Sequence, residues 1–477
     1  MRPTPTSRTQ TETVSDSPTD TRRAPGLLDR AHLPFVVATL GLVTLGAFEN
    51  RATATVLPVA ARELHGLTLF GAATAAPLAS YLVATTVAGL WADRRGAVPP
   101  LRLGLVTFGL AQAATGFAPS MAVVAVGRLV SGVAEGMLDV SLTVLVAAAL
   151  PERLRPRMFA AISTAWILPS VVGPGLAGAV ATAAGWRWVF LLSLLLLGPA
   201  VLALRPSLRA ARDLPGPLGA GGAAGPVVRG AVVAALALTA LTALTPLAGR
   251  PGATPYAVVL LVLAAAVTLV AVHPTLPTGT FALAPGVPAL VAQSALLAAA
   301  FGLAGTYIPL MLTTVRDVGP GLAGASLSVT GAFWSLGSWL QSLPAAQERT
   351  TPVQRVRLGF LLIAVGAVGP LLLAVTGVPL WAGLALWAVA GTGIGICSPT
   401  LATTTLALVP EDGRGRVTAA RSIASAVGQG VVLGGAGALV AAHADDLGGG
   451  DFGLVAAVAV ALAAVGALTA GRVRPPG

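Results

Sequence analysis

The sequence predicts an all-α protein that crosses a membrane many times. Of its 477 residues, 55% are hydrophobic and only 10% are charged, and the mean hydropathy is +0.84. A soluble protein carries about 25% charged residues. Apolar stretches of about 17 to 28 residues recur along the chain, and about 20 such residues cross the hydrocarbon core of a bilayer. A bilayer therefore explains the composition better than a soluble core does.

Fourteen apolar stretches are expected to form the transmembrane helices. The seventh and eighth are short, and the loop that follows the eighth carries no arginine. Twelve spans is the alternative, if neither of these two stretches crosses the membrane. The fourteen stretches lie near residues 34–58, 68–91, 101–118, 122–150, 158–184, 188–204, 230–247, 256–272, 287–313, 320–343, 357–376, 379–409, 415–442 and 452–471.

The placement of the arginines predicts the orientation. With the N-terminus in the cytoplasm, twenty-two arginines fall in cytoplasmic segments and four in the opposite ones. Cytoplasmic loops of membrane proteins carry such an excess of positive charge. We therefore expect a multi-pass protein of the cytoplasmic membrane, bacterial in origin, with both termini in the cytoplasm. The remaining three arginines, Arg51, Arg128 and Arg421, lie within the spans or at their edges.

Composition also divides the chain into segments. The first 30 residues are rich in Thr, Ser, Pro and Arg, lack hydrophobic periodicity and do not resemble a signal peptide. A Pro- and Gly-rich stretch later separates six predicted helices from the rest. We expect a disordered cytoplasmic tail (1–30), a six-helix bundle (31–204), a cytoplasmic linker (205–229), two extra transmembrane helices (230–285) and a second six-helix bundle (286–477).

Residues needed for several kinds of chemistry are missing from the sequence. There is no lysine, so a GxxxxGK phosphate-binding loop is excluded, and the single cysteine, Cys397, excludes a disulfide framework. The four histidines lie in tails or loops without the spacing of metal ligands. The arginine placement explains the net charge of +11 without nucleic-acid binding. We expect no metal, no cofactor and no enzymatic activity.

A line of ionisable residues runs along the fourth span. Arg128, Glu135 and Asp139 are separated by steps that bring them within roughly 20° of one helix face, over about 16 Å of rise. Such residues at membrane depth usually face a water-filled path. Glu49 in the first span lies at a depth similar to that of Arg128, so we expect an ion pair between them. The alternatives are that Arg128 reaches the interface and that the two acids make structural hydrogen bonds.

The loop after the second span resembles a signature of the major facilitator superfamily. Its sequence, Gly89-Leu90-Trp91-Ala92-Asp93-Arg94-Arg95-Gly96, is similar to G-x-L-A-D-R-x-G at the same place in that family. The resemblance implies a latch that holds two halves together in the outward-facing state. Trp91 and Ala97 depart from the pattern, which implies a weaker latch. The residues implied in it are Gly89, Asp93, Arg94 and Gly96, and we expect Gly89 to allow a close helix approach and Gly96 a tight turn.

Other spans extend this resemblance. Arg128 to Gly132 is similar to the R-x-x-x-G element of the fourth helix, and residues 169–178 resemble the antiporter motif of drug exporters. In that motif Gly173 and Gly178 are expected to allow close helix packing, and Pro174 to bend the helix. The segment from Glu49 to Pro58, and less closely residues 411–440, resemble the fourteen-helix drug:proton antiporter branch.

The resemblance implies two six-helix bundles of the major facilitator type, with two extra linker helices between them. It also implies proton-coupled efflux of small amphipathic drugs or metabolites, cationic ones among them, by alternating access. We expect Glu135 or Asp139 to be the coupling acid, with the Glu49–Arg128 pair controlling its access. A dedicated exporter or an uptake symporter of a single small metabolite is the alternative.

The second half of the chain offers polar and aromatic residues for a substrate surface. We expect Gln293, Tyr307, Trp381 and Trp387 to line the cavity, opposite the carboxylates of the first half. The alternative is that the tryptophans only pack or anchor helices at the interface. The expected partners are the small substrate, protons and membrane lipid, and we expect a monomer.

Overall fold

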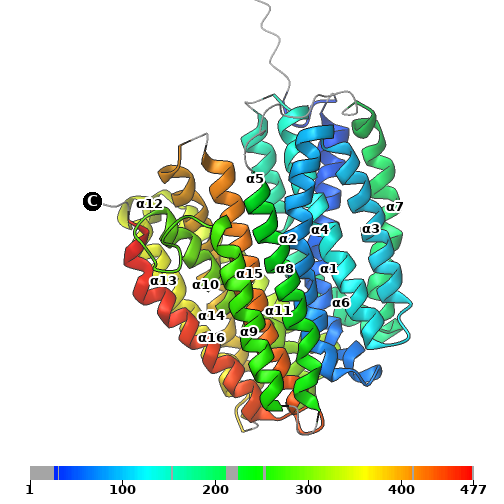
Figure 1. Ribbon diagram of the computed structural model, residues 1–477, viewed down its shortest axis with the longest axis vertical. Helices are drawn as coiled ribbons and strands as arrows, with labels where there is room; N and C mark the ends of the chain where they lie inside the picture. Colours follow the sequence, from blue (N-terminus) through cyan, green and yellow to red (C-terminus); the bar gives the residue numbers. More distant parts are fainter. Residues whose placement is uncertain are drawn as a thin grey trace, which may run out of the picture.

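A computed structural model describes residues 26–30, 32–151, 154–210, 224–250, 254–375, 377–410 and 413–474 (Figure 1). Within these ranges the chain is helical and contains no β-strand. Most of the expected tail and the central part of the expected linker lie outside the described residues. The helices are α1 (Leu33–Glu63), α2 (Phe70–Arg95), α3 (Val98–Gly116), α4 (Met121–Ala149), α5 (Arg155–Ala165), α6 (Ile167–Ala184), α7 (Arg187–Ala210), α8 (Ala224–Leu244), α9 (Thr254–Val272), α10 (Val287–Val315), α11 (Pro320–Ser342), α12 (Pro344–Arg349), α13 (Pro352–Leu373), α14 (Leu380–Leu408), α15 (Arg414–Ala442) and α16 (Gly449–Thr469).

Each of the fourteen apolar stretches forms a helix, and the fifth is split in two. Its first part, α5, ends at Ala165, four residues before Pro169. A proline ring clashes with the carbonyl of the residue four positions earlier and cannot donate a hydrogen bond to it. The sequence at Pro169 therefore accounts for a break that the expected single helix did not include.

Twelve of the described helices are long and apolar enough to cross a membrane. They include α8 and α9, the two stretches whose crossing was in question. Outside the twelve are α3 and α11, of 19 and 23 residues, which are as long as spanning helices but less apolar. The protein is therefore an all-α multi-pass membrane protein, and fourteen spans stays a prediction.

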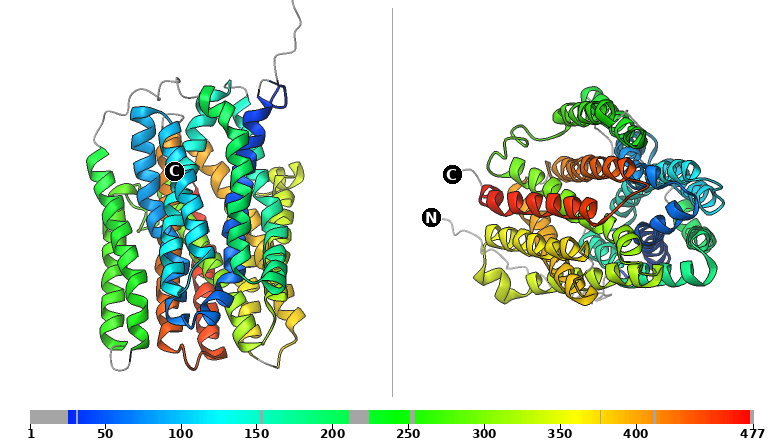
Figure 2. Two further views of the ribbon diagram at one scale, coloured as in Figure 1. Left: turned by 90° about the vertical axis from the view of Figure 1, so that its right-hand side faces the viewer. Right: turned by 90° about the horizontal axis from the view of Figure 1, so that it is seen from below.

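The long helices pack in two groups with a helical pair beside them. In the first half (α1–α7), α4 packs on α2 and α3, and α1 packs on α6 and α7. In the second half (α10–α16), α14 packs on α11 and α13, and α16 packs on α10 and α13. The pair α8–α9 lies at one side of the molecule, against α2 and α15 (Figure 2). This pair therefore contacts both halves.

The two halves meet through glycines on two helix pairs, α2 with α15 and α6 with α11. Gly71 of α2 lies directly against Gly437 of α15, with no room for a side chain on either. On the other pair, a Cβ atom at Gly178 would lie 2.7 Å from the carbonyl oxygen of Pro320. No hydrophobic driving force brings helices together within a bilayer, so their contact depends on close packing. Glycine at these positions lets the helix backbones approach closely enough for that packing.

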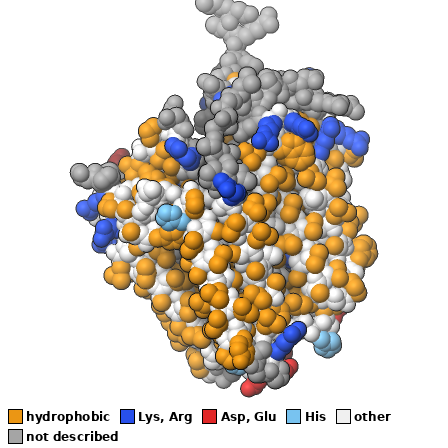
Figure 3. Space-filling model, in the orientation of Figure 1, with side chains coloured by type: hydrophobic (Ala, Val, Ile, Leu, Met, Phe, Trp, Pro, Cys, Tyr) orange, Lys and Arg blue, Asp and Glu red, His pale blue; other side chains and the backbone are white. Residues whose placement is uncertain are grey.

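The two halves are also joined at the predicted outer end of the bundle. There Arg62 donates a hydrogen bond of 2.6 Å from Nη1 to the carbonyl oxygen of Thr313. Toward the opposite end, at the top of Figure 1 where α1 begins, α13 and α16 lean away from the first half. Arginine side chains gather at that end, above a broad hydrophobic band (Figure 3). The protein thus adopts a conformation with its predicted outer end closed.

Candidate functional site

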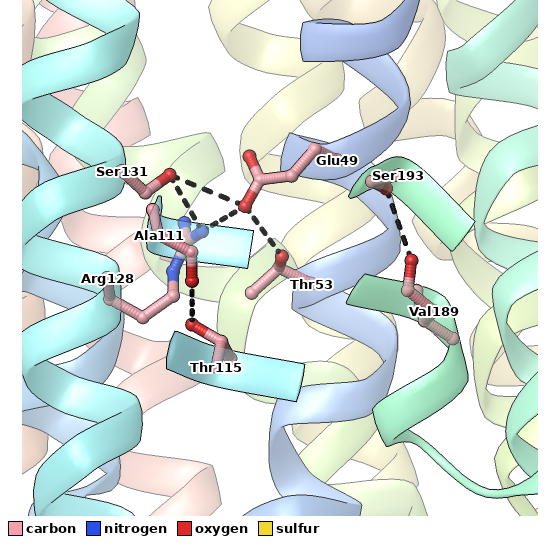
Figure 4. Close-up of polar contacts among 8 residues, drawn as sticks. All are labelled: Glu49, Thr53, Ala111, Thr115, Arg128, Ser131, Val189 and Ser193. Carbon is pink, nitrogen blue, oxygen red and sulfur yellow. Dashed lines mark hydrogen bonds and ion pairs between the residues drawn. The ribbon is translucent and has the colours of Figure 1, made fainter. Parts of the chain in front are cut away.

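A buried ion pair joins α1 and α4. Nη1 of Arg128 donates to Oε1 of Glu49, and each residue is only 6% exposed (Figure 4). The same carboxylate oxygen accepts from Thr53 Oγ1 at 3.2 Å and from Ser131 Oγ at 3.4 Å. Arg128 also donates to Ser131 Oγ at 3.2 Å. The expected pair is present, and its hydroxyl partners offset the loss of hydration that burial imposes on both charges.

Glycines beside the charged line set the position of α4. A Cβ atom at Gly132 would overlap the carbonyl of Pro77 on α2, and one at Gly136 would lie 2.7 Å from Cβ of Ala84. These two glycines allow α2 and α4 to pack closely along much of their length. The neighbouring face of α4, with Arg128 and Glu135, is then turned toward the space between the halves.

This space is a cavity of about 560 Å³ between the two halves. Its wall includes side chains from α1, α2, α4 and α6 and, across the interface, from α10, α11, α14 and α15. A volume of this size accommodates a small organic molecule. The polar, charged and aromatic residues of the wall include Asn50, Arg51, Tyr81, Arg128, Glu135, Phe301, Trp334, Trp387, Arg421 and Gln429.

The two acids expected as coupling residues lie in different surroundings. Glu135 is partly buried and lines the cavity, and its carboxylate has no hydrogen bond or salt bridge to the described residues. Asp139, one turn further along α4, is exposed and accepts a hydrogen bond of 2.8 Å from Tyr81 Oη. It does not belong to the cavity wall. Only Glu135 combines a free carboxylate with a position at the cavity.

Of the four residues expected to line the substrate surface, only Trp387 does so. The expectation for Gln293 is wrong because its side chain is buried between α10 and α16. There Nε2 donates to the carbonyl oxygen of Gly466 at 3.1 Å and to Oγ1 of Thr469 at 2.9 Å. Trp381 lies in the first turn of α14 and is 74% exposed, well away from the cavity.

Tyr307 also does not line the cavity. Its hydroxyl donates to the carbonyl oxygen of Leu433 at 3.3 Å, and its ring packs edge-to-face against Phe70, with ring centroids 5.5 Å apart. It therefore joins α10 to α15 and to the first half at the closed end. The two helices that carry the four expected residues, α10 and α14, are apolar on nearly every side. Their sequences therefore do not indicate which side chains face the cavity.

Two arginines of the cavity were not expected there. The guanidinium carbon of Arg51 lies 5.1 Å from the ring centroid of Trp334, across the interface between the halves. Nε of Arg421 donates to Oγ of Ser294 at 2.9 Å. A signal for both was present, because with Arg128 they were the three arginines that could not be assigned to a loop. Trp334 and Gln429 had no such signal.

Most of the expected latch loop is helical, because Gly89 to Arg95 form the end of α2 and only Gly96 lies beyond the helix. Gly96 ends the helix with a φ of 77°, where side chains are disfavoured. Arg94 is exposed, and the side chain of Asp93 lies outside the described residues. Gly89 was expected to allow a close helix approach, but a Cβ atom there would meet no neighbouring atom within 4 Å. In this conformation, therefore, Gly89 does not serve helix packing.

The antiporter-like motif on α6 faces two different helices. Gly173 is directed toward α1, where a Cβ atom would lie 3.5 Å from the ring of Phe48 and 3.6 Å from Cβ of Arg51. Gly178 and the carbonyl of Pro174 contact α11 of the other half, the carbonyl opposite Gly324. The motif therefore lies at the interface between the halves and beside the cavity.

A model of the Major Facilitator Superfamily matches residues 39–433. The chain belongs to the major facilitator superfamily. It is 30% identical over 395 residues to a probable multidrug-efflux transporter of Mycobacterium tuberculosis, covering 79% of this chain and 80% of that protein. A multidrug resistance protein B homolog from the same organism is 32% identical over 167 residues, which is 33% of this chain and 30% of the relative.

Solved structures of this superfamily fold are similar along nearly the whole chain. The crystal structure of a peptide transporter POT mutant in complex with alafosfalin has a TM-score of 0.65 at 16% identity, covering 92% of this chain and 94% of the other. A POT family transporter in complex with 5-aminolevulinic acid has a TM-score of 0.66 at 12% identity, covering 93% and 96%. At this identity the likeness shows the fold alone. The match to the superfamily model and the relative that is 30% identical show that the protein is a multi-pass membrane transporter of small molecules.

Proposed function

We propose that this transporter exports small amphipathic molecules across the cytoplasmic membrane in exchange for protons. The two halves rock about the central cavity, so that it opens to one side of the membrane at a time. Two relatives, one named as a probable multidrug-efflux transporter and one as a multidrug resistance protein B homolog, support export of several compounds rather than uptake of one. The motif on α6, which resembles that of drug exporters, supports the same direction.

The position of Glu135 carries the proposal. Its carboxylate lines the cavity and has no hydrogen-bonding or ionic partner among the described residues, so it is available to a proton or to a substrate. The nearby Glu49 is already held by Arg128, Thr53 and Ser131. An acid that exchanges protons must be reachable by water, and a change in its charge must break few interactions of the protein. Glu135 meets both requirements better than Glu49 does.

The exchange follows from competition at this carboxylate. With the cavity open to the outside, Glu135 takes up a proton and no longer holds a cationic or polar group of the substrate, which leaves. With the cavity open to the cytoplasm, Glu135 loses its proton and binds the next substrate molecule. The Glu49–Arg128 pair keeps a fixed arrangement of charges beside Glu135. Arg128 lies seven residues before Glu135 on α4, and Glu49 lies on the neighbouring α1. Asp139 and Tyr81 lie between Glu135 and the predicted cytoplasmic end, where they provide polar groups along the path.

Everted membrane vesicles separate proton coupling from substrate binding. We expect Glu135→Gln to abolish substrate accumulation driven by a pH gradient. Exchange of labelled for unlabelled substrate without a gradient should persist at higher substrate concentrations, because glutamine holds the substrate more weakly than the carboxylate does. The control is Glu348→Gln, at an exposed glutamate on the short helix α12. Gradient-driven accumulation by Glu135→Gln at the level of the control would contradict the proposal. Accumulation in right-side-out vesicles under an inward proton gradient would instead favour the uptake symporter.

A further inference from the structure

We infer that the cavity binds zwitterions, with Arg51 and Arg421 as the site of the substrate's anionic group and Glu135 as the site of its cationic group. The inference rests on the proposed exchange of substrate for protons and specifies the class of substrate. It begins with the charges of the cavity wall, which include three arginines but a single carboxylate, Glu135. Arg128 is neutralised by Glu49 behind the wall. Neither of the other two arginines has a carboxylate partner among the described residues.

Arg51 is a cation without an acid. Among the described residues its guanidinium forms no salt bridge, and its buried Nε has no hydrogen-bond partner. Its one evident attractive contact is with the face of Trp334, 5.1 Å away. Such a cation–π contact contributes roughly 0.5–2 kcal/mol and leaves the edge N–H groups of the guanidinium free. These groups suit a carboxylate, which accepts two parallel hydrogen bonds from an arginine.

Arg421 provides a second cation from the opposite half. It projects from α15, whereas Arg51 projects from α1. Its guanidinium forms one hydrogen bond with the described residues, from Nε to the hydroxyl of Ser294. No carboxylate among the described residues pairs with it. An anion held between Arg51 and Arg421 would therefore contact both halves of the transporter. It would also place a negative charge beside two arginines that have no carboxylate partner among the described residues.

The wall between the charged groups is aromatic. Phe301 and Trp387 are stacked with ring centroids 5.1 Å apart, and Trp334 packs edge-to-face on Phe301 at 5.7 Å. Trp387 is 1% exposed, and its indole N–H has no partner among the described residues. A flat apolar body fits this wall, and a polar atom on it would satisfy the indole N–H.

A zwitterion is more consistent than a simple anion with the proposed exchange of substrate for protons. A proton on Glu135 makes the cavity more positive, so a simple anion would bind better together with the proton and would move in the same direction. Exchange requires that the proton displace the substrate. A substrate with a cationic group at Glu135 satisfies that requirement, while its anionic group binds Arg51 and Arg421.

Three dyes with related ring systems test this inference on the purified full-length protein. Rhodamine B carries a cationic xanthene and a carboxylate, its ethyl ester carries only the cation, and fluorescein carries only negative charge. At neutral pH we expect rhodamine B to bind about tenfold more tightly than the ester in fluorescence anisotropy titrations, since charge-assisted hydrogen bonds are lost in the ester. Fluorescein should bind more weakly than rhodamine B. Equal affinities for rhodamine B and its ester would overturn the inference, and this comparison needs no variant.

Variants assign the anion site. In Arg51→Gln and Arg421→Gln we expect the preference for rhodamine B over its ester to fall to about twofold or less, while affinity for the ester stays within about twofold of the wild type. Arg421→Lys should retain part of the preference. The matched control is Arg102→Gln, at an exposed arginine of α3. A preference that survives both substitutions would overturn the assignment. Proton-driven transport without a charge preference would refute this inference alone, and a charge preference without proton coupling would refute the proposed exchange.

Discussion

Arg128 on α4 and Glu49 on α1 form a buried ion pair, each residue only 6% exposed, seven residues before Glu135 on the same helix face. The pair fixes two cavity helices of the first half relative to each other. It also leaves Glu135 as the acid of the cavity wall that is free to change its charge. In the proposed mechanism, Glu49 thus has a structural role and Glu135 the coupling role, although the two carboxylates lie close together.

The first prediction concerns the stability that this pair provides. Arg128→Met leaves Glu49 buried without its cation, and we expect the free energy of unfolding to fall by about 3–5 kcal/mol. The double variant Glu49→Gln/Arg128→Met should recover much of the loss, because no charge is then left unpaired. Unfolding of the purified protein in detergent measures both. The exposed pair of Glu63 and Arg187 is the control, and breaking it should change stability by about 1 kcal/mol or less.

The second prediction separates the two acids of α4. Asp139 lies outside the cavity wall and accepts a hydrogen bond from Tyr81. An asparagine oxygen can accept the same bond. We therefore expect Asp139→Asn to keep gradient-driven transport within about threefold of the wild type. Loss of coupling in Asp139→Asn, with coupling intact in Glu135→Gln, would move the role of coupling acid to Asp139.

The third prediction concerns closure of the two halves. A side chain at Gly178 would collide with the backbone of α11 at Pro320 and Gly321. We expect Gly178→Val to separate α6 from α11 and to open the predicted outer end. A cysteine introduced at Thr306 in the cavity wall should then react faster with a membrane-impermeant maleimide added from outside. The native Cys397 is buried and should not interfere.

The control for this experiment is Gly41→Ala on α1, where a Cβ atom meets nothing within 4 Å. It should leave both transport and labelling unchanged. Unchanged labelling in Gly178→Val as well would mean that the α6–α11 contact does not determine the closed conformation.

The fourth prediction compares two glycines of the latch loop. Gly96 has a φ of 77° and a ψ of 173°, a region that is almost restricted to glycine. Gly96→Ala should therefore lower stability by about 1–3 kcal/mol. Gly89→Ala should not lower it, because the position is open in this conformation. If Gly89→Ala nevertheless impairs transport, a close approach at Gly89 must occur in the outward-facing state, as the family resemblance implies.

Much of the fold could be predicted because the signals are local. Each of the fourteen apolar stretches is a helix, since about 20 apolar residues in a bilayer have to satisfy their backbone hydrogen bonds within the segment. The Glu49–Arg128 pair could be predicted for a similar reason. Two charges at one depth on antiparallel helices have few other ways to offset the loss of hydration. Even the break between α5 and α6 has a visible cause in Pro169.

Local patterns in the chain thus specify the helices, their membrane environment and the charged face of α4. Which residues of the second half face the cavity depends instead on how the helices pack. Trp387 lines it, whereas Gln293, Tyr307 and Trp381 do not, and Arg51 and Arg421 bring positive charge to it from opposite halves. The physical reason is that a helix that is apolar on every side carries no periodic signal of its orientation. That orientation depends on the packing of glycines such as Gly71, Gly178 and Gly437 between helices far apart in the sequence.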